Sequence, residues 1–331
     1  MGVDPSTVPP FTVATLFTET AIDPLLLTGI ILAGALYLWG VQRLRRGGVH
    51  WPVGRTWSFL LGGLGTLSFV TMSGVGAYDE TLFSVHMVQH MVLAMVTPIF
   101  LALGAPVTLA LRALPIRGRK RLNRALHWKV SRFYMHPFVG FVIFVGSPWL
   151  LYFTGWYEAS IRNVWLHELM HVHFLFSGAV FFWPLIGLDP VPGRVSHPFR
   201  VLLLVATLPF HAFLGLTIMQ SSTLLAGDYY GSLDLAWSDP FSEQRVGGGL
   251  LWSSGELVGL LMLGAALYQW MKASEREAVR VDRQLDREEA AREAADRARA
   301  PSEASTGRAI PPDRSAGAVA STDQETPAAS E

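Results

Sequence analysis

The sequence has 331 residues, of which 50% are hydrophobic and 16% charged, whereas a typical soluble domain carries about 25% charged residues. Its formal net charge is zero, so no excess of positive charge indicates a nucleic-acid partner. The absence of cysteine excludes disulfides, thiolate metal ligands and cysteine nucleophiles. A site for a soft metal must therefore be built from histidine and methionine.

The hydrophobic residues are gathered in blocks of about 17 to 25, the length that crosses a hydrocarbon layer of about 30 Å as a helix. No basic segment precedes the first block, which therefore predicts a membrane span and not a cleaved signal peptide. We expect an all-α membrane protein, a bundle of about seven transmembrane helices. The predicted spans are Pro24–Gln42, Trp57–Val75, Leu82–Leu103, Pro137–Phe153, Val164–Leu188, Phe199–Leu225 and Leu250–Met271.

The loops between the predicted spans alternate in charge. The first, third and fifth loops are basic, and the third carries Lys and Arg from Arg112 to Arg132 without an acid. The second loop holds Asp79 and Glu80, and the sixth is also acidic. Because basic loops stay in the cytoplasm, the N-terminus is expected outside and the C-terminus inside. The basic charge of the third loop is explained by this rule alone, and the alternative is that the loop forms an amphipathic segment lying on anionic lipid.

Composition divides the chain into four parts. Residues 1–22 are expected to form an extracytoplasmic N-terminal segment, and residues 23–272 the transmembrane domain. Residues 273–300 are rich in Ala, Glu and Arg and predict a charged cytoplasmic helix. Residues 301–331 are almost without large apolar side chains, so burial cannot offset the entropy of ordering them, and disorder is expected.

Two of the predicted spans begin with paired histidines. The third contains His86 and His90 and the fifth contains His167 and His171, so each pair shares one helical face, about 6 Å apart along the axis. Both helices enter from outside, which places the pairs at matching depth, and neighbouring helices would bring four imidazoles together. Imidazole is the commonest metal ligand, so a metal or haem site is favoured. The alternative is hydrogen bonding between helices or a wet cavity.

Other residues could complete this site or lie just behind it. Glu256 lies about 9 Å below the start of the seventh span, and a buried carboxylate needs a partner such as imidazole. Met219 lies at similar depth in the sixth span. His173 lies about 200° around the helix from His171, so we expect it to make a hydrogen bond or to belong to a separate site.

Two further features lie deeper. Met87, Met91 and Met95 recur every four residues beside the histidine face, which is more often packing, although thioethers with imidazoles suit monovalent copper. His211 lies about 21 Å below the outer end of the sixth span, too deep for the outer histidines unless Pro209 breaks the helix. We interpret it as a second site, a relay for metal or protons, or a hydrogen-bonded side chain.

Four stretches of the chain are similar to one known family. They are HMVQHMVLAMVTPIFLALGAPV from His86, HELMHVHFLFSGAVFFWPLIG from His167, PFHAFLG from Pro209 and DPFSEQRVGGGLLW from Asp239. With the pattern of spans, the chain resembles the polytopic CtaG-type cytochrome c oxidase assembly factors of bacteria over residues 20–272. The C-terminal tail lies outside the resemblance.

The resemblance implies a non-enzymatic role in maturing a haem–copper oxidase at the bacterial cell membrane. It implies no catalytic residues and makes His86, His90, His167 and His171 the copper-handling residues. Monovalent copper is favoured, with iron or haem as alternatives. The implied partners are the copper-bearing catalytic subunit of the oxidase, an extracytoplasmic copper donor and the lipid bilayer.

Three rival functions share some of these features. Di-iron membrane oxygenases and desaturases carry HxxxH boxes, but typically on the cytoplasmic side and with an HxxHH box, which this sequence lacks. A b-type haem protein would ligate haem through histidines on facing helices. A copper transporter needs a continuous polar path, for which only His211 is available in the inner half.

Overall fold

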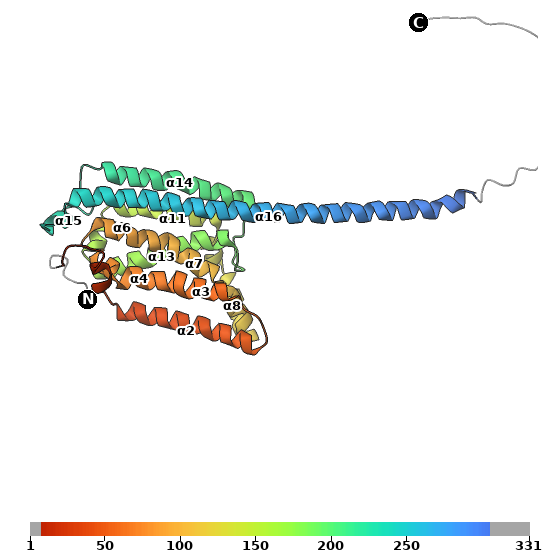
Figure 1. Ribbon diagram of the computed structural model, residues 1–331, viewed down its shortest axis with the longest axis horizontal. Helices are drawn as coiled ribbons and strands as arrows, with labels where there is room; N and C mark the ends of the chain where they lie inside the picture. Colours follow the sequence, from red (N-terminus) through yellow and green to blue (C-terminus); the bar gives the residue numbers. More distant parts are fainter. Residues whose placement is uncertain (1–7, 305–331) are drawn as a thin grey trace, which may run out of the picture. The chain divides into compact units, whose positions relative to one another are not determined.

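The computed structural model describes residues 8–304, and every regular element within this range is helical (Figure 1). The chain divides into two units, Met1–Met271 and Lys272–Glu331. The first unit contains the helix bundle, and the prediction of an all-α membrane protein is confirmed. Which end of this bundle faces the outside stays a prediction.

Six helical stretches are long and apolar enough to cross a membrane, against about seven predicted spans. They are Pro24–Arg46, Val53–Tyr78, Phe83–Ala113, Val164–Ile186, His197–Gln220 and Pro240–Arg297. The remaining predicted span forms α11 (Pro137–Tyr152), which has only 16 residues. It packs against α13 (Val164–Ile186) and α14 (His197–Gln220), so it belongs to the bundle although it is short.

The second and third spans are not continuous α-helices. The second consists of α3 (Val53–Trp57), the π-helix η1 (Ser58–Gly65), α4 (Thr66–Met72) and α5 (Gly74–Tyr78). The third consists of α6 (Phe83–Met91), the π-helix η2 (Val92–Val96), α7 (Thr97–Leu103) and α8 (Pro106–Ala113). Ala105 adopts the left-handed conformation at φ 49° and separates α7 from α8. Such π segments occur often at functional sites.

The basic third loop is itself helical. It forms α9 (Ile116–Leu126) and α10 (Lys129–Tyr134), and neither of these described helices contains a buried residue. The other short elements are α1 (Thr15–Thr18), α12 (Trp156–Ile161) and α15 (Tyr229–Ser232). The first span is α2 (Pro24–Arg46), whose first turn is capped by Asp23.

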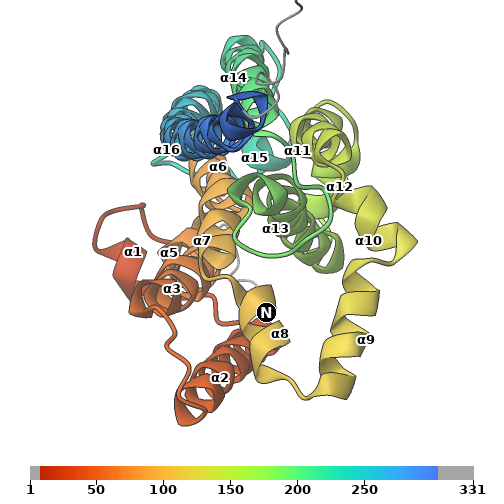
Figure 2. The same cartoon turned by 90° about the vertical axis from the view of Figure 1, so that its right-hand side faces the viewer.

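Helix α13 lies in the middle of the first unit, between α7 and α11, whereas α2 and α8 pack together to one side (Figure 2). A Cβ atom on Gly178 of α13 would overlap the carbonyl oxygen of Ala94 in η2, so glycine is needed for this close approach. Gly215 of α14 and Gly248 of α16 (Pro240–Ala304) likewise allow two backbones to meet. The contact at Gly178 brings together the two spans that carry the histidine pairs.

Within the second unit, the described residues continue helix α16 as far as Ala304. Residues 272–297 are almost all exposed, and Glu293 pairs with Arg297 one turn later. Helix α16 covers the segment 273–300 for which a charged helix is predicted. The expected disorder of residues 305–331 and the start of the N-terminal segment, residues 1–7, lie outside the described residues.

Candidate metal centre

The first turns of α6 and α13 bring the two histidine pairs side by side. The ring centroids of His86 and His167 are 6.0 Å apart, and those of His90 and His171 are 6.1 Å apart. Within the pairs the distances are 3.8 Å for His86–His90 and 4.5 Å for His167–His171. The four imidazoles therefore form one group at the end of the bundle where α6 and α13 begin, which we call the histidine end.

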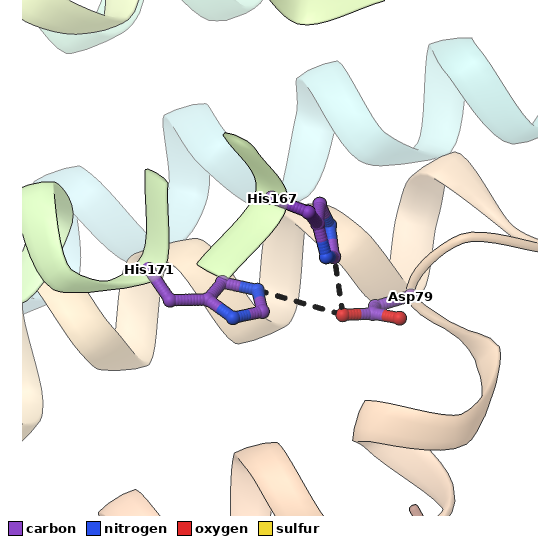
Figure 3. Close-up of side chains that lie close together, drawn as sticks. All are labelled: Asp79, His167 and His171. Atoms are coloured by element: carbon purple, nitrogen blue, oxygen red, sulfur yellow. Dashed lines mark ion pairs between the residues drawn. The ribbon is translucent and has the colours of Figure 1, made fainter. Parts of the chain in front are cut away.

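The ligand atoms that converge most closely come from Asp79, His167 and His171 (Figure 3). One ligand atom from each of these residues lies within 4.8 Å of the other two. The Oδ2 atom of Asp79 is 3.5 Å from Nε2 of His171 and 3.8 Å from Nε2 of His167. We call these three residues the carboxylate–histidine cluster. Asp79 joins it from the turn between α5 and α6, just after the second span.

The charges around the cluster favour a cation. Burial alone would raise the pKa of the Asp79 carboxyl, but His167, His171 and His86 together hold it below its ordinary value. Asp79 is thus a buried anion that needs a positive partner. Burial and the neighbouring Asp79 raise the pKa of Glu80 to about 7. The Glu80 carboxylate lies 3.5 Å from Nδ1 of His167.

Gln89 sets the protonation of His171. The Nε2–H group of Gln89 donates to the carbonyl oxygen of Val70 at 3.0 Å, so Oε1 faces His171. The Nε2–H group of His171 then donates to that oxygen at 2.8 Å. An ion that binds Nε2 of His171 has to displace this proton and end the hydrogen bond to Gln89.

His86 and His90 lie behind the cluster and are more deeply buried. His86 has an exposed fraction of 0%, and neither of its ring nitrogens has a hydrogen-bond partner among the described residues. Nδ1 of His90 lies 2.8 Å from the hydroxyl of Tyr152, whereas its Nε2 has no partner in the described chain. Nε2 of His167 also lacks a hydrogen bond to any described residue. Buried polar atoms without partners are rare and often mark an ion or water site.

An aromatic wall closes the group on the side of α11 and α12. The ring of His86 is 4.9 Å from that of Tyr157, whose hydroxyl lies 2.6 Å from the hydroxyl of Tyr230. Burial is the main cause that raises the pKa of both hydroxyls well above the ordinary range. These phenols stay protonated and act as neutral hydrogen-bonding groups.

The structure places the other predicted site residues away from the cluster. Glu256 is half-buried in α16, and its side chain makes no hydrogen bond or ion pair with any described residue. Met219 packs on Gly248 and Gly249 of the same helix. His173 is exposed and lines a separate apolar pocket of about 460 Å³ between α11, α12 and α13. No hydrogen bond or ion pair within the described residues joins these three side chains to the cluster.

The predicted depth of His211 is wrong. Helix α14 ends at Gln220 and not at Leu225, so His211 lies about 14 Å from that end. Pro209 lies inside α14, which continues past it. His211 lines the same small cavity as His90, so it is a near neighbour of the four imidazoles.

Sequence reasoning missed the roles of Asp79, Gln89 and Tyr152. From the sequence, Asp79 indicates only the charge of the second loop. Its place directly after the second span, at the depth where the histidine pairs begin, is the signal that could have identified it. Gln89 and Tyr152 carry no comparable signal, because their roles depend on how three helices pack.

Comparison with known proteins agrees with these motifs. The sequence model of the family described as cytochrome c oxidase caa3 assembly factor matches residues 35–273.

The chain is 42% identical over 286 residues to uncharacterized proteins of Mycobacterium tuberculosis and Mycobacterium bovis, covering 84% of this chain and 43% of those proteins. It is 41% identical over 278 residues to one of Mycobacterium leprae, covering 82% of this chain and 42% of that protein. The chain thus spans less than half the length of these relatives. No solved structure matches it. The chain belongs to the cytochrome c oxidase caa3 assembly factor family.

Proposed function

We propose that this protein binds copper as cargo at the carboxylate–histidine cluster and supplies it to a haem–copper cytochrome c oxidase during assembly. The observation that carries the proposal is the convergence of Asp79, His167 and His171 beside unpartnered imidazole nitrogens. Membership of an oxidase assembly family supports the oxidase as the partner.

The donor set suits copper. Imidazole and carboxylate ligands bind divalent first-row metals in an order that peaks at copper. Thioethers together with imidazoles favoured the monovalent ion in the sequence, and the carboxylate of Asp79 makes the set fit the divalent ion as well. A bound cation would stabilise the buried Asp79 anion and give Nε2 of His167 a partner.

A pocket of about 90 Å³ gives access to the cluster. Asp79, Glu80, His167, Glu168 and His171 are among the residues that line it. The side chain of Glu168 is 40% exposed, so the pocket has an acidic entrance that attracts cations. An ion can therefore be exchanged at the histidine end, which the charges of the loops predict to face the outside. The family resemblance implies an extracytoplasmic copper donor on that side.

The packing of the rings favours a single ion over haem. The centroids of His86 and His90 are 3.8 Å apart, and a pocket of about 90 Å³ is much smaller than the roughly 300 Å³ of a small ligand site. The rival of a di-iron enzyme predicts two iron ions per chain. We propose a role without catalysis, in which the cluster holds copper and a bacterial cell membrane carries the protein next to the catalytic subunit of the oxidase.

The test is a double variant, His86→Ala with His167→Ala, in cells that make the oxidase. We expect the purified variant to lose the copper held at the carboxylate–histidine cluster and the oxidase to lose its copper, with the variant still inserted in the membrane. His127→Ala is the matched control, because this exposed histidine bonds only to the backbone of Asn123. Normal oxidase copper in the double variant, or two irons per purified wild-type chain, would overturn the proposal.

A further inference from the structure

A small cavity next to the four imidazoles is surrounded by a second set of side chains of the kinds that can bind a metal. The cavity has a volume of about 20 Å³ and is lined by Met87, His90, Met91, Met95 and His211. The rest of its lining is hydrophobic apart from the hydroxyl of Tyr152. We call it the thioether cavity. We propose that it is a second metal site, which takes a monovalent copper ion through thioether sulfur and imidazole nitrogen.

Two hydrogen bonds prepare the imidazoles for this role. Nδ1–H of His211 donates to the carbonyl oxygen of Thr207 at 3.1 Å, and because a carbonyl only accepts, the lone pair of this ring is on Nε2. Nδ1 of His90 is paired with the Tyr152 hydroxyl, so its unpartnered Nε2 is the atom left for a ligand. Fixing one ring nitrogen so that the other binds metal is the usual arrangement around metal-ligating histidines.

The π-helix η2 brings the methionines onto one line. In a regular α-helix, side chains four residues apart drift by about 40° per step, so Met95 would have turned well away from Met87. Residues of a π-helix turn through a smaller angle each, and the step from Met91 to Met95 runs through η2. The looser winding offsets the drift, which explains how all three methionines reach one cavity.

The size and lining of the cavity select the ion. A volume of about 20 Å³ holds one water-sized species, so a hydrated divalent ion does not fit. Met87 and Met95 have exposed fractions of 0% and 2%, which keeps their sulfur atoms away from water. Soft thioether and imidazole donors without a carboxylate select monovalent copper. The inference rests on the proposed function for copper as the cargo, but it uses donors other than those of the carboxylate–histidine cluster.

The experiment is titration of the full-length protein in detergent with cuprous ion under anaerobic conditions, followed by copper X-ray absorption. We expect two copper ions per wild-type chain, with sulfur among the scatterers. The triple variant Met87→Leu/Met91→Leu/Met95→Leu should lose one ion and the sulfur signal, because leucine nearly keeps the volume of methionine but has no donor. Met262→Leu, at a half-buried methionine of α16, is the matched control and should keep both copper ions and the sulfur signal.

The outcomes separate the two proposals. One copper without sulfur in the wild type would overturn the thioether site and leave the carboxylate–histidine cluster standing. One copper with sulfur that is retained by Asp79→Asn/His167→Ala would overturn the cluster and support the thioether site. A sulfur signal that persists in Met87→Leu/Met91→Leu/Met95→Leu would overturn the assignment to the cavity. Even if the methionine variant fails to fold, the presence or absence of sulfur scattering in the wild-type spectrum tests the thioether site.

Discussion

The carboxylate–histidine cluster and the thioether cavity are adjacent but differ in donors and in access. The cluster offers oxygen and nitrogen beside an acidic, partly exposed pocket, whereas the cavity offers sulfur and nitrogen and is enclosed by hydrophobic side chains. Helix α6 serves both, since Gln89 bonds to His171 and the next residue, His90, lines the cavity. Neighbouring positions on one helix can thus support sites for two oxidation states of one metal.

The strongest test of this difference is Asp79→Asn. The substitution keeps the shape of the side chain and removes its charge, so we expect divalent copper to bind the cluster at least about 100-fold more weakly, the upper range for changes around a metal site. Binding of cuprous ion in the thioether cavity should not change. Competition titration against a chelator of known affinity measures both. Asp228→Asn, at an exposed loop residue, is the control. Equal losses of copper affinity at the cluster and at the thioether cavity would show that they are one site.

Gly178→Ala should weaken both regions together. An added Cβ meets the carbonyl oxygen of Ala94, so α13 must move away from η2, at a cost of about 1 to 3 kcal/mol. Thermal unfolding should show a lower midpoint, and both copper affinities should fall. Gly146→Ala in α11 is the control, because no described atom of another helix lies within 4 Å of the position that its added methyl group would take. An unchanged midpoint would contradict the close approach of the two helices.

Tyr152→Phe should affect the thioether cavity alone. The lost hydroxyl frees Nδ1 of His90, and we expect about tenfold weaker binding of cuprous ion, as for other groups that orient a ligating histidine. Divalent copper binding at the cluster should stay the same. The titrations used for Asp79→Asn apply here. Tyr134→Phe is the control, and a loss at the cluster would mean that the two regions share His90.

Gln89→Leu should have the smallest effect and the opposite sign. The wild-type glutamine stabilises the protonated Nε2 of His171, so its removal should strengthen copper binding at the cluster about fivefold, which corresponds to one hydrogen bond of about 1 kcal/mol. Gln244→Leu is the matched control, since it also removes a buried glutamine that bonds to the backbone. Both variants should unfold more easily, but only Gln89→Leu should bind copper more tightly. Weaker binding would contradict the assigned proton.

Much of the fold was predictable because hydropathy and helical spacing are local properties. Blocks of apolar residues predicted the spans, and the spacing of His86 with His90 and of His167 with His171 placed each pair on one face. The end of α14 was placed too far along the chain because no charged residue interrupts the sequence between Gln220 and Leu225. The short fourth span was predicted almost as observed, as Pro137–Phe153 against Pro137–Tyr152 for α11.

The site was predictable only in part because its remaining members depend on packing. Asp79 reaches the cluster through a turn, and Tyr152 at the end of α11 pairs with His90 on a different helix, α6. The methionine stripe was assigned mainly to packing, since methionines at helical spacing more often pack than bind metal. The π-helix that aligns it has no marker in the hydrophobic pattern. Glu256 and Met219 had suitable depth, but they face other neighbours.

The π-helix η2 makes this span unusually tolerant of a change of length at one point. A π segment is equivalent to one residue inserted into an α-helix. Deleting one residue from Val92–Val96 and restoring the regular winding would leave Met87 and Met95 seven residues apart and within about 20° of each other around the helix. The same deletion in a regular α-helical stretch would rotate all later residues by about 100°. A shortened η2 could thus keep the deeper donors on the face of the upper histidines.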